Sequence, residues 1–360
     1  MPLLDFLKSK KILGLDVGSY AIKLVELKPK KKSGEIIYEL ENVGYEPVPY
    51  QSIVEGSIMD APAVADAIQR VFYENKIKTN NVCIGVSGSS VIVKKFEVQR
   101  TSPDELHEQI LWEARPHLPF GGEDVAIDYE IIESPDIPPE RVGVILAAVR
   151  RDKLNEYLNV LAIADKNVEI IDVESFAILN AVLYNNEFYK DKIVAIINIG
   201  ASITNVIIAK NGYPVLVRDI SFGGNQFTDM IQKELNLKYE KAEAIKKGRQ
   251  IEGISQAAVK PVINIMYNEL KQEVAKTFDF YRSSTEGGDI ENIILSGGTA
   301  SLENITEMFS SDFSLPGEVF NPFARIEINP KKGDFEYINE IAPVFSVAVG
   351  LAIRATGEGK

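Results

Sequence analysis

The sequence has little cysteine and little histidine. Of its 360 residues, one is a cysteine and two are histidines. A single thiol excludes a disulfide within the chain and fits a reducing cytosol. Because Cys83 lies in the apolar run VCIGV, we expect a buried core thiol rather than a nucleophile. His107 and His117 have no cysteine partners at a zinc-binding spacing, so the sequence predicts no zinc site.

Positive charge is also scarce. The chain carries 39 Lys and Arg residues against 52 Asp and Glu residues, which gives a net charge of −13. Such a balance repels phosphate backbones except at a local basic patch. The basic cluster Lys28 and Lys30 to Lys32 lies in a hairpin connection without interleaved aromatic residues. We therefore expect a solvated loop there and no nucleic-acid partner.

Long apolar runs are missing as well. A membrane-spanning helix needs about 20 apolar residues, but the most apolar stretch, 193–209, is interrupted by polar residues such as Asn198 and Asn205. The opening MPLLDFLKSKK is too short and too charged for a signal peptide. We expect no transmembrane segment. With 45% hydrophobic and 25% charged residues, the composition is that of a folded protein large enough for two domains.

The segment LGLDVGSYAIKLVEL, residues 13–27, contains one carboxylate and a small turn between two strand-like runs. Apolar residues alternate on both sides of the turn, which predicts a β-hairpin. Its tip at Gly18, Ser19 and Tyr20 offers backbone N–H groups and a hydroxyl, and Lys23 follows just inside the next strand. Such a tip can hold an anion. An ordinary surface turn is the alternative.

The pattern of the opening hairpin returns in the second half of the chain. The hairpin is followed by an expected strand at 36–43, a helix at 60–77 and a strand at 81–86. Over 90–166 the pattern of expected strands and helices changes to that of a small inserted α+β module. From Lys192 two apolar strands again surround a Gly-Ala-Ser tip, and a third strand follows Asn-Gly. We therefore expect two related domains whose turns face one cleft.

This pattern resembles the actin-like nucleotide-binding superfamily, in which two such domains close on ATP. The matching motifs follow one another in the expected order. They are a first phosphate loop at Asp16 to Ser19 with Lys23, a connecting helix at 172–177, a second phosphate loop at 199–204, an AExxK motif at 242–246, an adenosine motif at 295–299 and a second connecting helix at 343–354.

The resemblance implies an α/β fold of the actin-like (ribonuclease H-like) kind, with two domains built from duplicated β-meander and helix units and a small inserted α+β subdomain. The implied divisions are 1–89 for the first core subdomain, 90–168 for the insertion, 169–190 for the connecting helix, 191–325 for the second domain and 326–360 for a return to the first.

The resemblance also implies a site for ATP and Mg²⁺. Asp16 would hold the water shell of Mg²⁺, which keeps most of its waters when bound to a nucleotide, and Asn198 would contact the ion through water. Glu174 would position the attacking water, with Asp16 as the second catalytic residue. The residues implied in cofactor binding are Asp16, Gly18, Ser19, Tyr20, Lys23, Asn198, Gly200, Ala201, Ser202, Thr204, Gly223, Gly224, Glu243, Lys246, Gly297, Gly298 and Thr299.

One position departs from the superfamily pattern. The second phosphate loop usually carries an aspartate two residues before its glycine, and here that position is Asn198. An amide can accept a hydrogen bond from a metal-bound water but cannot neutralise the ion or take a proton. We therefore expect at most a slow ATPase. A metabolic kinase of this fold needs a catalytic base beside a second substrate pocket, and the inserted module contains no motif for one. His117, between Pro116 and Leu118, is expected to be a packed residue rather than that base.

Within the superfamily the sequence is similar to a narrower family, the type IV pilus assembly protein PilM, a relative of the cell-division protein FtsA. The segments that carry this similarity are Glu113-Ala114, Leu118-Pro119-Phe120, Asp128-Tyr129, DVESFAILNA at 172–181, RDISFGGNQFT at 218–228, Asn321-Pro322-Phe323 and PVFSVAVGLAIR at 343–354.

The family resemblance implies a cytoplasmic, ATP-binding scaffold recruited to the cytoplasmic face of the inner membrane. Its partner would be the N-terminal cytoplasmic peptide of PilN, held in a groove between the first core subdomain and the insertion. The scaffold would link PilN and the inner-membrane platform to the pilus motor ATPase and so serve twitching motility. Nucleotide would act mainly on domain closure.

Two other functions remain open. One is a filament-forming, FtsA-like division or cytoskeletal protein. FtsA-type proteins attach to membranes through a C-terminal amphipathic helix, whereas this sequence ends in LAIRATGEGK after its last core element, which favours the pilus family. The other is a metabolic phosphotransferase, for which the sequence offers the weaker support given above.

Overall fold

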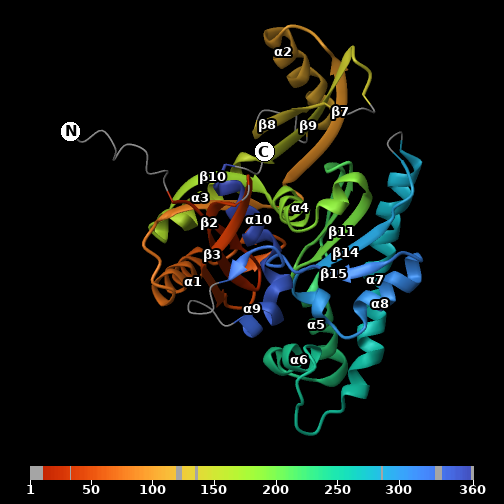
Figure 1. Cartoon of the computed structure of the whole chain (residues 1–360). Helices are drawn as coiled ribbons and strands as arrows, with labels where there is room; N and C mark the ends of the chain where they lie inside the picture. Colours follow the sequence, from red (N-terminus) through yellow and green to blue (C-terminus); the bar gives the residue numbers. More distant parts are fainter. Residues whose placement is uncertain are drawn as a thin grey trace, which may run out of the picture.

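The computed structural model describes residues 11–32, 34–118, 124–133, 137–284, 287–328 and 335–357. Two β-sheets, each flanked by helices, stand side by side, and a smaller sheet projects from one end (Figure 1). Residues 1–10 and the predicted Pro119-Phe120 pair lie outside the described residues. Two related sheets with helices and an inserted α+β module, as predicted from the sequence, are therefore present.

The first sheet contains the opening hairpin. It has six strands in the order β10-β6-β1-β2-β3-β16. β1 pairs antiparallel with β2 and parallel with β6, so the turn after β1 lies at the edge where the parallel strands end. The bounds are β1 Leu13–Val17, β2 Ala21–Lys32, β3 Glu35–Pro47, β6 Asn81–Val86, β10 Asn167–Val173 and β16 Glu327–Ile328, with α1 Ala61–Glu74 and α3 Arg151–Ile163 packed on the sheet.

The second sheet repeats this arrangement, as the sequence predicts. Its five strands follow the order β13-β12-β11-β14-β15, and β11 pairs antiparallel with β12 and parallel with β14. The strands are β11 Ile193–Ile199, β12 Thr204–Lys210, β13 Tyr213–Ile220, β14 Asn292–Ser296 and β15 Gly317–Val319, and the helices are α5 Gly224–Leu235, α6 Tyr239–Lys246, α7 Gln256–Ser283 and α8 Ile305–Phe313. α6 ends at Lys246, and Gly248 follows shortly after it with a left-handed φ of 78°.

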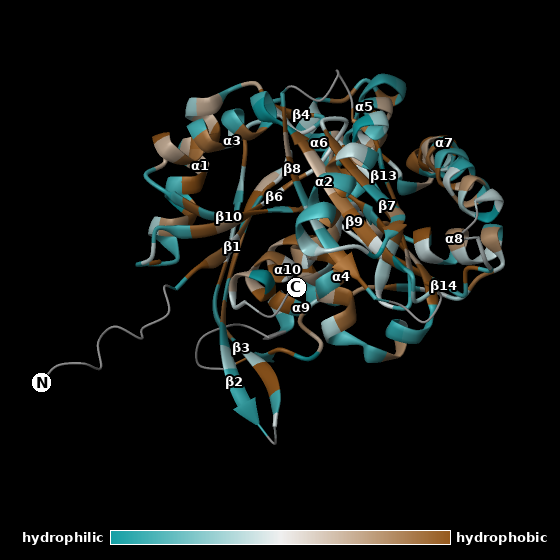
Figure 2. Ribbon diagram, turned by 90° about the horizontal axis from the view of Figure 1, so that it is seen from above, coloured by the Kyte–Doolittle hydropathy of each residue, from teal (hydrophilic) through white to brown (hydrophobic). Residues whose placement is uncertain are grey.

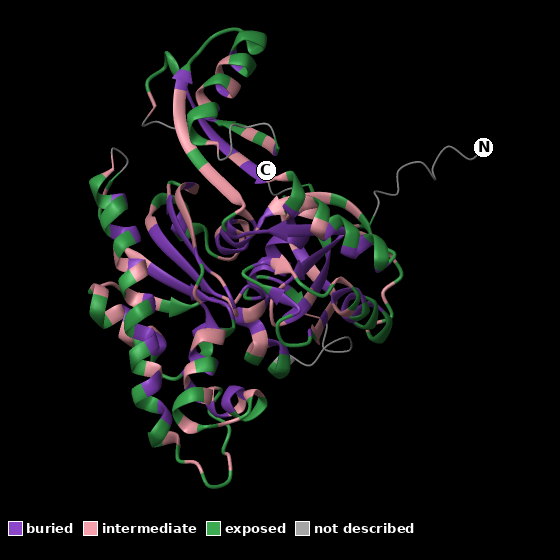
Figure 3. Ribbon diagram, turned by 180° about the vertical axis from the view of Figure 1, so that it is seen from behind, coloured by how far each residue is buried: buried purple, intermediate pink, exposed green. Residues whose placement is uncertain are grey.

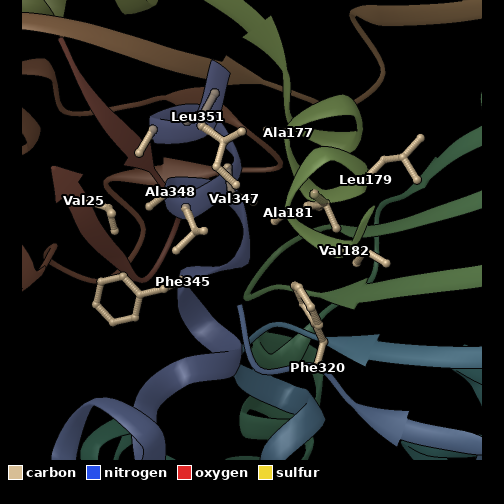
Figure 4. Packing of buried hydrophobic residues seen from close by; sticks show 14 of the residues in the cluster. Val25, Ala177, Leu179, Ala181, Val182, Phe320, Phe345, Val347, Ala348 and Leu351 are labelled. Carbon is tan, nitrogen blue, oxygen red and sulfur yellow. The ribbon is translucent and has the colours of Figure 1, made fainter. Parts of the chain in front are cut away.

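Two helices form the joint between the sheets. α4 (Glu174–Asn185) follows β10, and α10 (Ser346–Ala355) follows the short helix α9 (Phe335–Ile341). Val347 of α10 points towards α4, which carries Ala177 and Ala181 (Figure 4). The helices approach so closely that a Cβ on Gly350 would lie 1.8 Å from the backbone oxygen of Ala177. One core therefore connects both halves.

Residues 336–355 are long and apolar enough to cross a membrane by length and composition alone. Two-thirds of their most apolar window, 67%, is buried inside the protein. All of α10 up to Ile353 is buried against β1, α4 and their neighbours. Packing thus accounts for the apolar character of this segment as a core helix.

The inserted module is a three-stranded sheet with one covering helix. β7 (Val91–Gln99), β9 (Arg141–Arg150) and β8 (Val125–Ile132) pair in that order, and α2 (Pro103–Ala114) buries Leu106 and Ile110 against one face. The module projects from the body (Figure 3). α3, which the sequence boundary at 168 had assigned to the insertion, instead packs Tyr157, Val160 and Leu161 into the core of the first sheet.

Hydropathy follows this arrangement. The central strands and α10 are apolar, whereas the β2–β3 hairpin extends from the body as a polar arm (Figure 2). In that arm Lys30 forms ion pairs with Glu39 and Glu327, and Lys32 pairs with Glu327. The basic cluster is therefore partly neutralised by acidic neighbours. Cys83 is fully buried in β6, as its apolar setting predicts.

Candidate nucleotide cleft

A cleft of about 630 Å³ lies between the two halves. Most of the cofactor-binding residues inferred from the sequence line it, and Glu174 lies on its wall. The predicted residues in the lining are Asp16, Gly18, Ser19, Tyr20, Lys23, Glu174, Asn198, Gly200, Ala201, Ser202, Gly224, Glu243, Lys246, Gly297, Gly298 and Thr299. The tertiary structure thus brings together sequence motifs that are nearly 300 residues apart in the chain.

The first turn supplies a carboxylate and a cation. Asp16 is the fourth residue of β1, and Lys23 lies directly opposite it on β2. The Lys23 ammonium donates to Asp16 Oδ2 at 2.6 Å. Both side chains are largely buried, at 5% and 14% exposed for Asp16 and Lys23, so this pair compensates a charge that would otherwise be costly to bury.

The second turn is fixed to the start of α5. Gly200 N donates to Ile203 O and closes the turn, while the N–H groups of Gly224 and Asn225 donate to the carbonyls of Gly200 and Ala201 at 2.8 Å. A Cβ on Gly223 would lie 2.6 Å from both of these oxygens. Gly223 is therefore required for the close approach and lies behind the cleft lining rather than in it.

Thr204 also supports this turn from behind. Its side chain is fully buried, and its hydroxyl donates to the backbone oxygen of Phe222 at 2.7 Å. Thr204 and Gly223 are thus the two predicted residues that do not line the cleft. Their contacts hold the strand and the helix that frame the second turn.

The third glycine motif lies next to the second turn because β14 runs parallel to β11. Asn198 and Ser296 are register partners, so both strands end at the same edge. Gly297 has a φ of 85°, and a Cβ there would lie 2.4 Å from Ile199 O. A Cβ on Gly298 would meet only Val344, at 3.7 Å. Gly297 is needed by the fold, whereas Gly298 borders open space in the cleft.

The AExxK motif on α6 is internally paired. Glu243 accepts from Thr228 at 2.6 Å and forms ion pairs with Lys246 at 2.6 Å and Lys247 at 2.9 Å. The Lys246 ammonium also donates to Gly224 O and to the Thr228 hydroxyl. An ammonium has three donors, so Lys246 is saturated by protein groups and anchors α6 to α5 at the cleft wall.

Glu174 begins α4 on the side of the first turn. Burial, and secondarily the nearby charge of Asp16, raises the pKa of Glu174 to about 8, although a hydrogen bond from Ser87 opposes the shift. At neutral pH the side chain is therefore largely protonated. A carboxylic acid in this state donates a hydrogen bond more readily than it accepts a proton.

The rim of the cleft is bridged by aromatic contacts between the halves. The ring of Tyr50 packs at a tilt against Tyr239 of α6 with ring centroids 4.0 Å apart, and its hydroxyl donates to Asp229 at 2.9 Å. Lys247 lies over the ring of Tyr20 and donates to its hydroxyl at 3.0 Å. These contacts join the first half to α5 and α6.

Sequence reasoning missed several of these residues. Tyr50, Tyr239 and Lys247 carry no motif, and their pairing depends on how the halves face each other. Asn205 and Asp219 were also missed. Each is a polar residue within a largely apolar strand beside the second phosphate loop. A polar side chain at such a position is a signal of a functional or structural role that the sequence does offer.

The donor set fits a magnesium nucleotide better than a metal held by protein alone. Within the described ranges no group of three or more His, Cys, Asp or Glu side chains could hold a metal ion. Asp16 and Asn198 supply isolated oxygen ligands, as suits Mg²⁺ that keeps its waters and is carried by phosphates. Gly298 borders the same space without a Cβ, whereas Gly224 is packed so tightly that a Cβ would lie 2.6 Å from Thr299 Oγ1.

The comparisons with known proteins agree with this architecture over almost the full chain. The model of the family "Type IV pilus assembly protein PilM" matches residues 14–356. The chain belongs to the PilM family. It is therefore a type IV pilus assembly protein of the actin-like kind, as the sequence motifs predicted.

Individual relatives show the range of the fold. A chain of a solved "PilM-PilN type IV pilus biogenesis complex" is 26% identical, with a TM-score of 0.84, covering 96% of this chain and 98% of that one. The cell division protein FtsA of Pseudomonas aeruginosa is 23% identical over 95% of this chain and 88% of its own. MreB5 of Spiroplasma citri, solved with AMPPNP, is 16% identical with a TM-score of 0.52, covering 97% of each chain, and shows the shared fold.

Proposed function

We propose that the protein is a cytoplasmic scaffold of the type IV pilus inner-membrane assembly complex, and that it binds ATP with Mg²⁺ and the N-terminal cytoplasmic peptide of PilN. The observation that carries the proposal is the full-length similarity to the PilM chain of a PilM-PilN complex. Membership of the family gives the pilus context. Linkage to the pilus motor ATPase and the inner-membrane platform is part of the same proposal.

Support for nucleotide binding comes from the cleft and from the fold relatives. MreB5, which shares the fold, was solved with AMPPNP and with ADP. In this chain the backbone N–H groups of both turns and Lys23 would bind phosphate oxygens, and Asp16 and Asn198 would accept from metal-bound waters. Bound Mg²⁺ would supply charge compensation for the phosphates. Gly298 and Thr299 border the remaining space, where the nucleoside would lie.

The same side chains argue for slow hydrolysis. Asn198 cannot take a proton, and Glu174, the candidate that positions the attacking water, has a pKa raised to about 8 by burial and by the charge of Asp16. At neutral pH a carboxyl group with this pKa is mostly protonated, and only its ionised form can accept a proton from water. We therefore propose that nucleotide binding stabilises the closed cleft, and that turnover is slow or negligible.

For the peptide we propose the face of the inserted sheet that α2 does not cover, where it adjoins the first core subdomain. Side chains alternate across a strand, and Val142, Val144 and Leu146 of β9 pack under α2. Val93 and Ala147, which are register partners, therefore face the other way, and both are partly exposed. A short extended peptide could add apolar contacts there.

Titration calorimetry of the purified protein with ATP and with a synthetic PilN N-terminal peptide tests the proposal. We expect both ligands to bind, and Val93→Asp to weaken the peptide at least tenfold without changing ATP affinity. Ile131→Asp is the matched control, because Ile131 is exposed on the α2 side of the same sheet. Absence of peptide binding to well-folded protein would contradict the scaffold function.

A filament-forming, FtsA-like function is the second candidate, supported by the match to FtsA. Sedimentation with ATP distinguishes the two, because a filament pellets whereas a scaffold stays in the supernatant. Pelleting that depends on ATP and needs no peptide would favour the filament.

A further inference from the structure

A directed chain of hydrogen bonds runs across the second sheet from the cleft wall, where Asn198 and Asn205 are lining residues. Asn198 Nδ2 donates to Asn205 Oδ1 at 2.8 Å, Asn205 Nδ2 donates to Asp219 Oδ1 at 2.8 Å, and Gly88 N donates to Asp219 Oδ2 at 2.6 Å. The three side chains are register partners on β11, β12 and β13. Asn198 and Asn205 are buried, at 8% and 1% exposed.

The direction of this chain is set by its last member. An ionised carboxylate only accepts, whereas each Asn side chain has one donor end and one acceptor end. With one oxygen of Asp219 taken by Gly88 N, the other selects the donor end of Asn205. Asn205 therefore turns its oxygen to Asn198, and Asn198 must give its donor end to Asn205.

The consequence is that Asn198 keeps Oδ1 for partners outside the hydrogen-bonded chain, and Asn198 is itself a residue of the cleft lining. A Cβ placed on Gly297, a cleft residue, would lie 3.0 Å from Asn198 Oδ1. Metal-bound water donates hydrogen bonds, so an oxygen at this point attracts it and an NH₂ group repels it. An Asn alone does not determine which end it presents.

We propose that Asp219 is a positioning residue for the magnesium nucleotide, acting through Asn205 to hold Asn198 with its oxygen facing the cleft. This inference rests on the proposed binding of ATP with Mg²⁺. The carboxylate that the second phosphate loop lacks at position 198 is thus present two strands away, where it acts through the orientation of an amide rather than by contact with the ligand.

Asp219→Asn is the decisive substitution because it keeps every hydrogen bond but reverses the chain. To keep Gly88 N satisfied, the new amide must give its oxygen to Gly88 and its NH₂ to Asn205. Asn205 then turns its NH₂ to Asn198, and Asn198 turns its NH₂ into the cleft. We define the Mg²⁺ enhancement as the ratio of the ATP affinity in Mg²⁺ to the ATP affinity in EDTA. We expect the variant to fold, its Mg²⁺ enhancement to be about tenfold smaller than that of the wild type, and its affinity in EDTA to stay within about twofold of the wild-type value.

A matched rescue is available in the same chain. Asn198→Asp alone leaves two carboxylates competing for the single donor group of Asn205, so we expect a lower melting temperature without nucleotide. The double variant Asn198→Asp with Asp219→Asn restores a complete chain of opposite direction. We expect it to recover the melting temperature and the full Mg²⁺ enhancement, because an aspartate at 198 presents an acceptor in either orientation.

The measurements are titrations of the full chain with a fluorescent ATP analogue in Mg²⁺ and in EDTA, and thermal unfolding of the four nucleotide-free proteins. If Asp219 only anchors Gly88, Asp219→Asn leaves the Mg²⁺ enhancement at the wild-type value, and the proposal is overturned. A melting temperature of the double variant no higher than that of Asn198→Asp also overturns it. If the wild-type protein does not bind ATP, the proposed nucleotide binding is refuted, and the positioning role of Asp219 is refuted with it. This holds whatever melting temperatures the four proteins have.

Discussion

The two halves of the cleft are built on the same hairpin but differ at one pair of positions. In the first half Asp16 faces Lys23 across the β1–β2 ladder, and in the second Asn198 faces Asn205 across β11–β12. Each pair starts two residues before the glycine of its turn. The first half thus presents a carboxylate neutralised by a cation, whereas the second presents an amide oriented by neutral neighbours and a carboxylate behind them.

The difference between Asp16 and Asn198 shows that the two halves of a duplicated fold can present different chemical groups to one cleft. Two buried carboxylates on opposite sides of one cleft repel each other, and burying both costs free energy when no metal ion is bound. The first half already holds Asp16, whose charge raises the pKa of Glu174. With Asn198 in the second half, the empty cleft carries less repulsion. We infer that such a cleft is suited to binding and closing rather than to fast hydrolysis.

The largest effect we expect concerns the glycines of the two halves. Gly297→Ala should lower the free energy of unfolding by about 2–4 kcal/mol, because its φ is 85° and the added Cβ would lie 2.4 Å from a backbone oxygen. Gly18→Ala is the matched change in the first half, and its Cβ would lie 3.0 Å from the Lys23 ammonium and 3.1 Å from the backbone oxygen of Ala21, both longer than the 2.4 Å at Gly297. It should cost less than about 1 kcal/mol. Urea unfolding measures both, and equal losses would contradict the comparison.

The next effect makes the first half resemble the second. Asp16→Asn should weaken binding of ATP with Mg²⁺ on the order of 100-fold, because it removes the one charged oxygen ligand and leaves the Lys23 ammonium without its ion-pair partner. Asn198→Ala, the matched change across the cleft, should weaken binding about tenfold. A fluorescent ATP analogue measures both affinities. Retained affinity in Asp16→Asn would exclude Asp16 as the organiser of magnesium.

A smaller effect appears in the dependence of stability on pH. The pKa of Glu174 is raised to about 8 by burial and by the charge of Asp16, so the folded state holds a proton that the unfolded state releases from about pH 4.5 upwards. The contribution of Glu174 to stability is therefore favourable at low pH and is lost as the pH rises towards 8. Glu174→Gln should remove this loss, by on the order of 2 kcal/mol at pH 8.5.

Thermal unfolding between pH 5 and pH 8.5 compares Glu174→Gln with the wild type. We expect the two curves to diverge as the pH rises, with the variant the more stable at the alkaline end. Parallel curves would mean that Glu174 is already ionised in the folded protein, and would restore it as a candidate base at neutral pH.

The smallest effect concerns the rim that joins the halves. Tyr50→Phe keeps the ring on Tyr239 but removes the hydrogen bond to Asp229, which is solvent-exposed. We expect release of a fluorescent nucleotide to accelerate about two- to threefold. Tyr73→Phe is the control, because Tyr73 is 85% exposed on α1. A rate equal to that of the control would show that these contacts do not hold the cleft closed.

The sequence predicted the repeated hairpins because alternating apolar residues and a small turn are local signals. The resemblance carried by the motifs around Gly18, Gly200 and Gly298 implied a set of binding residues, and most of them line the cleft. It misplaced α3, because an amphipathic helix shows that one face is buried but not against which sheet. The sheet against which α3 packs becomes clear only in the tertiary structure, where Tyr157 of α3 lies in the core of the first sheet.

The order of the motifs, the missing carboxylate at Asn198 and the membership of an actin-like pilus family could all be derived from the sequence, because each depends on residue type and position along the chain. Only the tertiary structure decided which end of Asn198 faces the cleft, because that choice is made by Asn205 and Asp219 on neighbouring strands and by the backbone of Gly88 from the other half. Hydrogen bonds have direction, and the direction of a buried chain is fixed by contacts that no local pattern contains.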